Sequence, residues 1–244
     1  MLKIQGLKKN YEKKEAVKGI DLEIREGELF SLLGPNGAGK TTTLKMLVGL
    51  LKPTSGEIRI GGFDIVRNPI EAKKIISFVP DVPYIYDKLT PWEFLRFIGK
   101  LYAIEPKTSN DRAAELLKFF EMWSYRDVLI EEFSHGMKQK IILSGALLPE
   151  PKVFILDEPM VGLDPVSIHS FKEMMKRKAK EGMTIIFSTH TLAWAEELAD
   201  RIGIIHQGRL ISLGTLSQLQ QQFQSRENLE EMFMSLVAKE NESV

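Results

Sequence analysis

Two short motifs hold the residues whose types and spacing could do chemistry. The first fits G-x-x-x-x-G-K-[ST] without a mismatch, the pattern of a loop that cradles phosphates. It is Gly34-Pro35-Asn36-Gly37-Ala38-Gly39-Lys40-Thr41, followed by Thr42. The glycines let backbone N–H groups converge on phosphate oxygens, and the helix that begins there adds a favourable dipole. We expect this run and Thr42 to bind a nucleotide, with Lys40 on the β- and γ-phosphates and the Thr41 hydroxyl on Mg²⁺.

The second motif places two carboxylates, Asp157 and Glu158, directly after the apolar run 153–156. In open α/β sheets, ligands bind at this carboxyl end of the strands. Asp157 suits the shell of a Mg²⁺ ion, and Glu158 can orient an attacking water or accept its proton. Adjacent acids at a strand end are commonly a solvated turn. Because a phosphate-binding loop occurs in the same chain, we favour catalytic roles for Lys40 and Glu158.

Alternating strands and helices must position these motifs. Apolar or alternating runs predict strands at 20–24, 29–33, 75–79, 153–156 and 184–188. One amphipathic helix is expected over 44–51, ended by Pro53, and others begin near 165 and after 188. Such alternation predicts a mostly parallel sheet covered on both faces, and with the phosphate loop it is typical of a P-loop NTPase core.

The middle of the chain, from about 85 to 149, is expected to be helical. It opens on Thr90-Pro91-Trp92-Glu93, a capping box with Pro at the first helical position. This stretch has the character of an inserted α-helical subdomain. The predicted fold is therefore α/β, with an N-terminal antiparallel β portion, the core and this insertion, and 1–214 form one nucleotide-binding domain.

Composition excludes several function classes. Among 244 residues, Lys and Arg total 33 and Asp and Glu total 33. The chain therefore lacks the basic excess that a nucleic-acid-binding protein usually has. There is no cysteine, which rules out disulfides and thiolate metal sites. The opening MLKIQGLKKN lacks a secretory h-region, and no apolar run approaches the roughly 18 residues that cross a bilayer. We expect a cytoplasmic protein whose membrane role comes through a partner.

Taken in order, the motifs resemble those of the ATP-binding cassette (ABC) family, in particular the separate ATPase subunit of a bacterial membrane transporter. The resemblance covers about residues 2–214. Besides the two motifs above, it rests on the signature-like Ser134-His135-Gly136-Met137-Lys138-Gln139-Lys140, on Asp157-Glu158-Pro159, on the D-loop-like Gly162-Leu163-Asp164-Pro165 and on Ser188-Thr189-His190. It implies that ATP and Mg²⁺ are the cofactors, that His190 is a catalytic residue that contacts the γ-phosphate, and that Tyr11 stacks on adenine. Taken alone, Tyr11 is a core or edge aromatic residue.

The resemblance also implies two partners. One is a second ABC ATPase subunit, paired head to tail so that Ser134, Gly136 and Asp164 of one chain close over the phosphate loop of the other. The second is a polytopic membrane permease, which places the protein on the inner face of the cell membrane. Trp92, Phe94 and Phe97 could meet that permease, although aromatic residues in such a helix more often lie in the core.

Two positions depart from the family pattern. Met137 stands where the signature segment usually has glutamine, and Pro80-Asp81 stand where glutamine is expected after the strand 75–79. Asp81 has two interpretations. In the first, Asp81 is an ordinary turn residue between Pro80 and Pro83. In the second, its carboxylate replaces the glutamine amide as a Mg²⁺ ligand.

Two other function classes fit the sequence less well. Soluble ABC ATPases that act on ribosomes or DNA usually carry two cassettes or long coiled-coil insertions, which this chain lacks. A degenerate regulatory module is disfavoured by intact Lys40, Asp157, Glu158 and His190. Substrate, transport direction and homodimer versus heterodimer stay open, and the compact architecture resembles that of exporter subunits.

The C-terminal end, 215–244, is expected to be a helical extension. It carries an apolar stripe at helical spacing, made of Leu229, Met232, Phe233, Leu236 and Val237. We expect this helix to dock on its own chain, with a partner interface as the alternative. The other histidines, His135, His169 and His206, are assigned structural roles.

Overall fold

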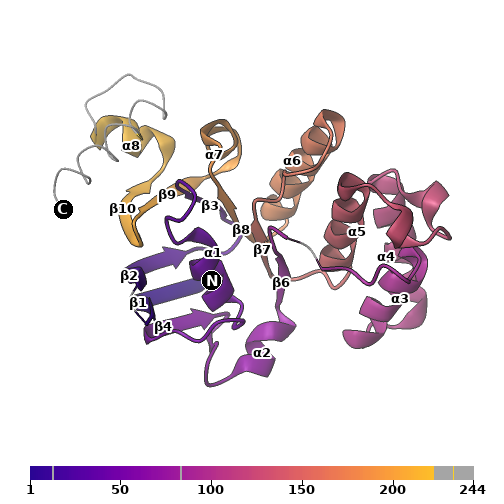
Figure 1. Cartoon of the computed structure of the whole chain (residues 1–244), viewed down its shortest axis with the longest axis horizontal. Coiled ribbons are helices and arrows are strands. Elements are labelled where there is room, and N and C mark those ends of the chain that lie inside the picture. Colours follow the sequence, from indigo (N-terminus) through magenta and orange to yellow (C-terminus); the bar gives the residue numbers. More distant parts are fainter. Residues whose placement is uncertain (13, 83, 223–232, 234–244) are drawn as a thin grey trace.

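The chain folds around two β-sheets (Figure 1). The structure is a computed structural model, and it describes residues 1–12, 14–82, 84–222 and 233. The first sheet is antiparallel, in the order β2-β1-β4-β5. Its strands are β1 (Leu2–Tyr11), β2 (Lys14–Ile24), β4 (Ser55–Ile60) and β5 (Phe63–Asp64). This sheet confirms the expected N-terminal antiparallel portion.

The second sheet is mixed, in the order β10-β9-β3-β8-β7-β6. Its strands are β3 (Leu29–Leu33), β6 (Ile76–Val79), β7 (Val153–Asp157), β8 (Thr184–Thr189), β9 (Arg201–His206) and β10 (Arg209–Gly214). Only the β10–β9 pair is antiparallel, so the prediction of a mostly parallel sheet is confirmed. Leu33 lies opposite Thr189 and Asp157 opposite Ser188, so the carboxyl ends of β3, β8 and β7 meet at one edge.

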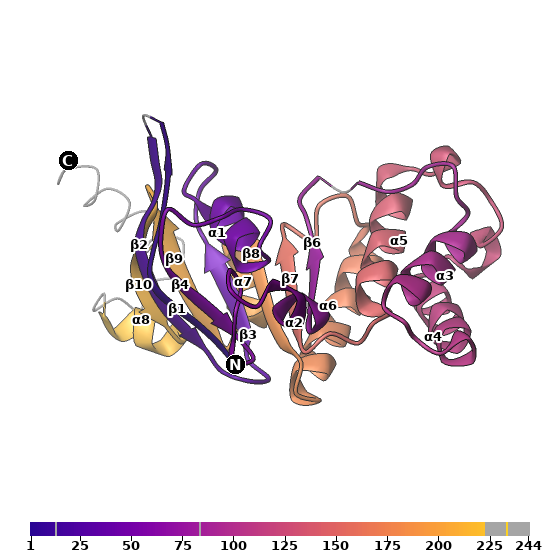
Figure 2. The same cartoon turned by 90° about the horizontal axis from the view of Figure 1, so that it is seen from below.

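Helices complete the fold. Those that follow strands of the sheets are α1 (Lys40–Leu47), α2 (Pro69–Lys74), α6 (Pro165–Lys180), α7 (Leu192–Leu198) and α8 (Leu216–Gln222). Between β6 and β7 come α3 (Pro91–Leu101), α4 (Pro106–Phe119) and α5 (His135–Leu147), with the 3₁₀ turns η1 (Trp123–Tyr125) and η2 (Ile130–Glu132). In both views α3, α4 and α5 gather at the end of the molecule away from the antiparallel sheet (Figures 1 and 2). The domain bounds 1–214 and 215–244 stay a prediction.

Helix α1 is shorter than the apolar spacing predicts. We expected it to reach Leu51, and it ends at Leu47. Gly49 follows with φ 65°, a left-handed conformation that glycine adopts without a Cβ penalty. The Leu50 amide then donates to the Lys45 carbonyl at 2.9 Å, which closes the helix end.

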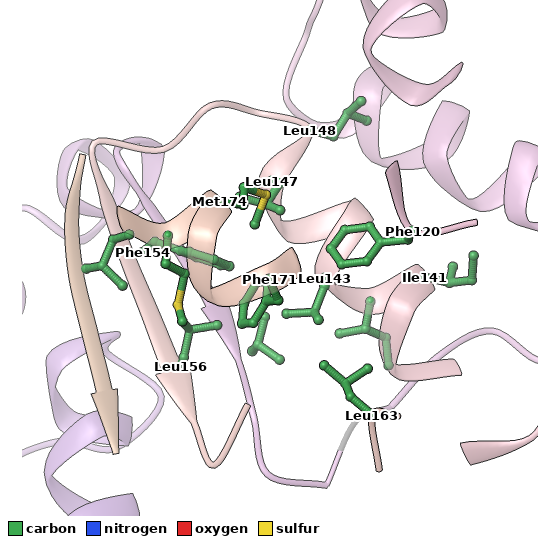
Figure 3. Packing of buried hydrophobic residues seen from close by; sticks show 14 of the residues in the cluster. Phe120, Ile141, Leu143, Leu147, Leu148, Phe154, Leu156, Leu163, Phe171 and Met174 are labelled. Atoms are coloured by element: carbon green, nitrogen blue, oxygen red, sulfur yellow. The ribbon is translucent and has the colours of Figure 1, made fainter. Parts of the chain in front are cut away.

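One apolar cluster joins the helical insertion to the sheet (Figure 3). Phe171 and Met174 on α6 lie between Phe154 on β7 and Leu143 and Leu147 on α5. All five side chains are buried. Since protein interiors are close-packed and transmit strain, α6 positions α5 relative to β7, the strand that ends at Asp157.

Helix α8 packs on the mixed sheet. Leu219 of α8 is buried in a cluster with Leu33 and Ile202, and Phe233 packs against the same cluster. Leu229, Met232, Leu236 and Val237 lie outside the described residues. None of the helices formed by the described residues has the length and apolar character needed to cross a bilayer.

Candidate active site

The phosphate loop runs from the end of β3 to the start of α1. A Cβ on Gly34 would lie 2.2 Å from the Ile205 carbonyl oxygen, so a larger residue cannot fit. Gly39 precedes α1 with φ 108°, and a Cβ there would lie 2.8 Å from the Ala16 carbonyl oxygen. The loop is thus held against β9 and β2 at its two ends. Its middle is open, since a Cβ on Gly37 would meet no atom of the described residues within 4 Å.

Lys40 is buried at the base of this loop. Its ammonium donates hydrogen bonds to the carbonyls of Gly34, at 2.7 Å, and Pro35, at 3.3 Å. The same nitrogen lies 3.5 Å from Oε1 of Glu158. A cation held by loop carbonyls and one carboxylate is well placed to exchange these partners for phosphate oxygens.

Asp157 ends β7 with one oxygen engaged and one open. Its Oδ1 accepts a 2.5 Å hydrogen bond from the Ser188 hydroxyl. Its Oδ2 is buried and has no hydrogen-bond partner among the described residues. A buried, unpaired carboxylate oxygen is costly unless a cation or donor meets it, and carboxylate suits Mg²⁺. Asp157 therefore fits the role that the sequence predicts.

Ser188 organises this pair of acids. While its hydroxyl donates to Asp157, its oxygen accepts a 3.1 Å hydrogen bond from the Glu158 amide. The sequence placed Ser188 in a motif but gave it no role. Ser188 lies opposite Asp157 because β7 and β8 pair in the parallel sheet. This pairing joins residues distant in the sequence, so no local sequence pattern predicts it.

Glu158 is the most constrained residue of the site. Its φ is 48°, a left-handed conformation that is uncommon for residues other than glycine and costs about 1–3 kcal/mol. The buried carboxylate accepts no hydrogen bond among the described residues. Its Oε1 lies 3.0 Å from Nδ1 of His190 and 3.5 Å from Lys40. The structure thus brings the three predicted catalytic residues together.

A hollow of about 300 Å³ opens beside these groups, close to the lower limit for small-molecule sites. It is lined by Tyr11, Lys14, Ala16, Pro35, Asn36, Gly37, Gly39, Lys40, Thr41, Thr42, Asp81 and Glu158. Gly34 and Ala38 are not among the lining residues, and Ala38 is buried.

Three of the lining residues bear on the sequence predictions. Tyr11 is exposed at the end of β1, with the Lys9 ammonium 5.1 Å from its ring centroid, so it is not a core residue. Asp81 reaches the hollow, as its interpretation as a ligand requires. Lys14 was not predicted from the sequence, and it lies there because β2 pairs it with Tyr11.

The signature residues lie apart from this hollow. Ser134 is exposed and caps α5, where its hydroxyl oxygen accepts a 3.3 Å bond from the Met137 amide. Gly136 is packed so closely that a Cβ would lie 2.4 Å from the Gly162 carbonyl oxygen. Neither Ser134 nor Gly136 lines the hollow of its own chain.

Asp164 caps the start of α6, close to the start of α5. A hydrogen bond from the Ser167 hydroxyl, with another from the Ser167 amide, holds the pKa of the Asp164 carboxyl well below its usual range. The Lys140 ammonium, 3.1 Å away, acts in the same direction. Asp164 is therefore charged and has a structural role in starting α6. It does not line the hollow either.

No three His, Asp or Glu side chains converge as a metal site within the part of the chain that the structure describes. This arrangement still fits Mg²⁺, which proteins commonly hold through one or two carboxylates together with substrate phosphates. Thr41 and Asp157 are the residues that would hold the ion, with Asp81 as the third candidate.

Residues 17–161 match the family model described as ABC transporter. The chain belongs to the ABC transporter family. It is 43% identical over 219 residues to the linearmycin resistance ATP-binding protein LnrL of Bacillus subtilis (strain 168), a match that covers 90% of this chain and 70% of LnrL. The resemblance drawn from the motifs is thereby confirmed.

Solved structures agree. An ATP-binding subunit of an ABC transporter superposes with a TM-score of 0.92 at 34% identity, covering 97% of this chain and 99% of that one. A dimeric post-hydrolysis cassette bound to ADP and Pi matches with a TM-score of 0.81 at 27% identity, covering 88% and 98%. The predicted fold and the ATPase activity of this ABC cassette are confirmed.

Replacing the Glu158 carboxylate by an amide tests its catalytic role. Glu158→Gln should lower ATP turnover by about 10²–10⁴-fold, the usual scale for loss of a general base. ATP binding should persist because the phosphate loop is unchanged, as measured by fluorescent-nucleotide titration. Glu71→Gln, a matched change on the exposed face of α2, should leave both values unchanged. Near-normal turnover in Glu158→Gln would assign the base to another residue.

Proposed function

We propose that this cassette energises a separate polytopic membrane permease by Mg·ATP-driven closure of a dimer of cassettes. One observation carries the proposal. Residues of the phosphate loop line one hollow together with Glu158 and Asp81, whereas Ser134 is exposed at the start of α5, outside that hollow. A site of this kind is completed by a second cassette.

Closure has a simple electrostatic basis. The start of α5 carries the positive end of the helix dipole and unsatisfied amide groups, which favour an anion. Ser134 adds a hydroxyl there. In a two-fold dimer the start of α5 in each chain would meet the γ-phosphate of the other chain's nucleotide. ATP then binds the cassettes together, and hydrolysis weakens that bond.

Within each site, the charges around Glu158 would rearrange on ATP binding. Lys40 and His190 would turn from the carboxylate to the γ-phosphate, which leaves Glu158 to orient the attacking water. The Mg²⁺ ion, held by Thr41 and Asp157, supplies charge neutralisation on the β- and γ-phosphates. Tyr11, Gly37 and Gly39 line the hollow. The ring of Tyr11 would stack on the adenine, and the backbone amides of the two glycines would bind the phosphates.

The proposed permease surface lies where the chain leaves β6. Tyr84 is 93% exposed, and Tyr86 packs edge-on against Phe97, with ring centroids 5.6 Å apart. Phe97 is itself 41% exposed. Exposed aromatic residues close together indicate an interaction surface. A cytoplasmic helix of the permease fits this surface, because aromatic anchors suit an amphipathic helix.

The other two aromatic residues suggested for that surface belong to the core. Phe94 is buried, and Trp92 is half-buried with its ring 6.0 Å from that of Trp123. Helix α3 turns this side inward, which is the alternative that the sequence left open. With no net charge to attract nucleic acid, a permease partner at the inner face of the membrane remains the best-supported assignment.

Size-exclusion chromatography tests closure. In Glu158→Gln protein, Mg·ATP should shift elution from monomer toward dimer at high protein concentration, since ATP is retained. Adding Ser134→Arg should block the shift, because the bulky cation occupies the space of the partner's phosphate. The matched variant Ser124→Arg, an exposed serine in η1, should not block it. A dimer that forms without ATP and tolerates Ser134→Arg would contradict the model of closure.

The role of Asp81 is tested by Mg²⁺ titration. If its carboxylate helps to hold the ion, Asp81→Ala should raise the Mg²⁺ concentration needed for half-maximal nucleotide binding and ATPase activity. Asp81→Gln should restore most of the rate, since an amide oxygen replaces the lost ligand. Unchanged titrations in Asp81→Ala would leave Asp81 as a turn residue.

Co-purification tests the permease assignment. From membranes of the native host, the affinity-tagged cassette should retain a polytopic membrane protein. Tyr84→Ser with Tyr86→Ser should lose that protein while keeping basal ATPase activity, because neither side chain lines the hollow. Tyr125→Ser, an exposed tyrosine of η1, is the matched control. Retention of the membrane protein by the double variant would move the docking surface elsewhere.

A further inference from the structure

Residues 80–82 and 84–89 lie beside three regions of the molecule. The first of them lie beside the hollow, where Asp81 is among the lining residues. Next come the exposed Tyr84 and Tyr86. The last lie against the start of α5, where the Asp87 carboxylate lies 2.9 Å from the Lys138 ammonium. No motif marks Asp87, which is 51 residues from Lys138 in the sequence.

Backbone hydrogen bonds fix the end of this segment. The Glu131 amide donates to the Asp87 carbonyl at 2.9 Å, and the Ile130 amide donates to the Leu89 carbonyl at 3.0 Å. Both donors lie in η2, directly before the loop that leads to Ser134. A displacement of residues 86–89 would therefore be passed to the approach of α5.

Lys138 lies in the first turn of that helix. Its amide donates to the Ser134 carbonyl at 3.0 Å, so Lys138 and the capping serine belong to one hydrogen-bonded turn. The neighbouring residues of α5 contact the segment after Glu158. Lys140 forms an ion pair with Asp164 at 3.1 Å, and the side-chain amide of Gln139 donates to the Pro159 carbonyl at 3.4 Å. The start of α5 is thus held between residues 84–89 and the segment that follows Glu158.

We propose that the Asp87–Lys138 ion pair is a positioning link that orients the start of α5 for dimer closure and couples this orientation to the permease helix that docks on Tyr84 and Tyr86. The inference rests on the proposed closure of two cassettes. It adds a link within one chain between the permease surface and Ser134, and it assigns Asp87 and Lys138 no contact with nucleotide.

The energetics suit a movable link. The Asp87 side chain is 49% exposed and that of Lys138 is 25% exposed. Pairs this accessible contribute little to folding, so the link can be broken or shifted without unfolding the domain. A two-fold dimer contains the pair twice, so its loss should weaken dimerisation about two- to thirtyfold.

The test uses Glu158→Gln protein as the parent and measures Mg·ATP-dependent dimerisation by analytical ultracentrifugation. Asp87→Ala and Lys138→Ala should each weaken the dimer by the stated factor, with unchanged binding of fluorescent ATP analogue to the monomer. The exchange Asp87→Lys with Lys138→Asp should restore most of the affinity. Lys88→Ala, which removes the neighbouring ion pair with Glu131, is the matched control and should have no effect.

The outcomes separate the alternatives. If Lys138 acted directly on the partner's phosphate, Asp87→Ala would strengthen the dimer and the exchange would not rescue it, which would overturn the proposal. Wild-type dimerisation in both single variants would overturn it as well. Equal loss of thermal stability in the variants and the exchange, without rescue, would mark the pair as merely structural. A parent that fails to dimerise with Mg·ATP would instead contradict the proposed function, so the two failures are distinguishable.

Discussion

The buried charge of Glu158 is the constraint on which the rest of the site depends. A carboxylate removed from water is tolerated only when cations or donors compensate it. Here Lys40 approaches from the loop after β3 and His190 from the end of β8, at 3.5 and 3.0 Å from the same oxygen. Both can reach it only because β3, β8 and β7 are neighbours and parallel. The strand order is therefore a requirement of the charge balance at the site.

The same balance gives the cassette a way to respond to its substrate. The ammonium of Lys40 is held by carbonyls and a carboxylate, all of which are weaker partners than a triphosphate with several charges. Exchange of partners would remove the Lys40 ammonium from the Glu158 carboxylate, which immediately precedes residues 159–164. That segment contacts α5 through Pro159, Gly162 and Asp164. A change in the partners of Glu158 thus acts on residues 159–164 and, through their packing, on α5. The close-packed helix can transmit a displacement beyond the site.

Much of this could be predicted from sequence because the signals are local. The phosphate loop, the strand before Asp157 and the capping box of α3, in which Thr90 and Glu93 exchange hydrogen bonds, each have their pattern within about ten residues. What could not be predicted depends on pairing between distant segments. Lys14 enters the hollow through hairpin register, Ser188 meets Asp157 across the sheet, and Asp87 meets Lys138 across 51 residues. Helix α1 ended early because the conformation of Gly49 outweighed the apolar spacing. The direction in which α3 turns Trp92, Phe94 and Phe97 was likewise fixed by packing.

The separation of Ser134 from the hollow has a consequence for how energy would be used. If every catalytic and binding group lay in one chain, hydrolysis would need no large movement. Here the donor-rich start of α5 lies outside, fastened to Asp87 on one side and to Asp164 on the other. In the proposed dimer, the nucleotide at one site would displace the start of α5 in the partner chain. This displacement would reach the partner's segment after Glu158 through Asp164, and its exposed tyrosines through Asp87. The two sites and the two docking surfaces would then move together, because each chain supplies part of both sites. In the proposed dimer, work on a permease would follow from this division of the site between chains, whereas a site complete in one chain would release the same free energy as heat.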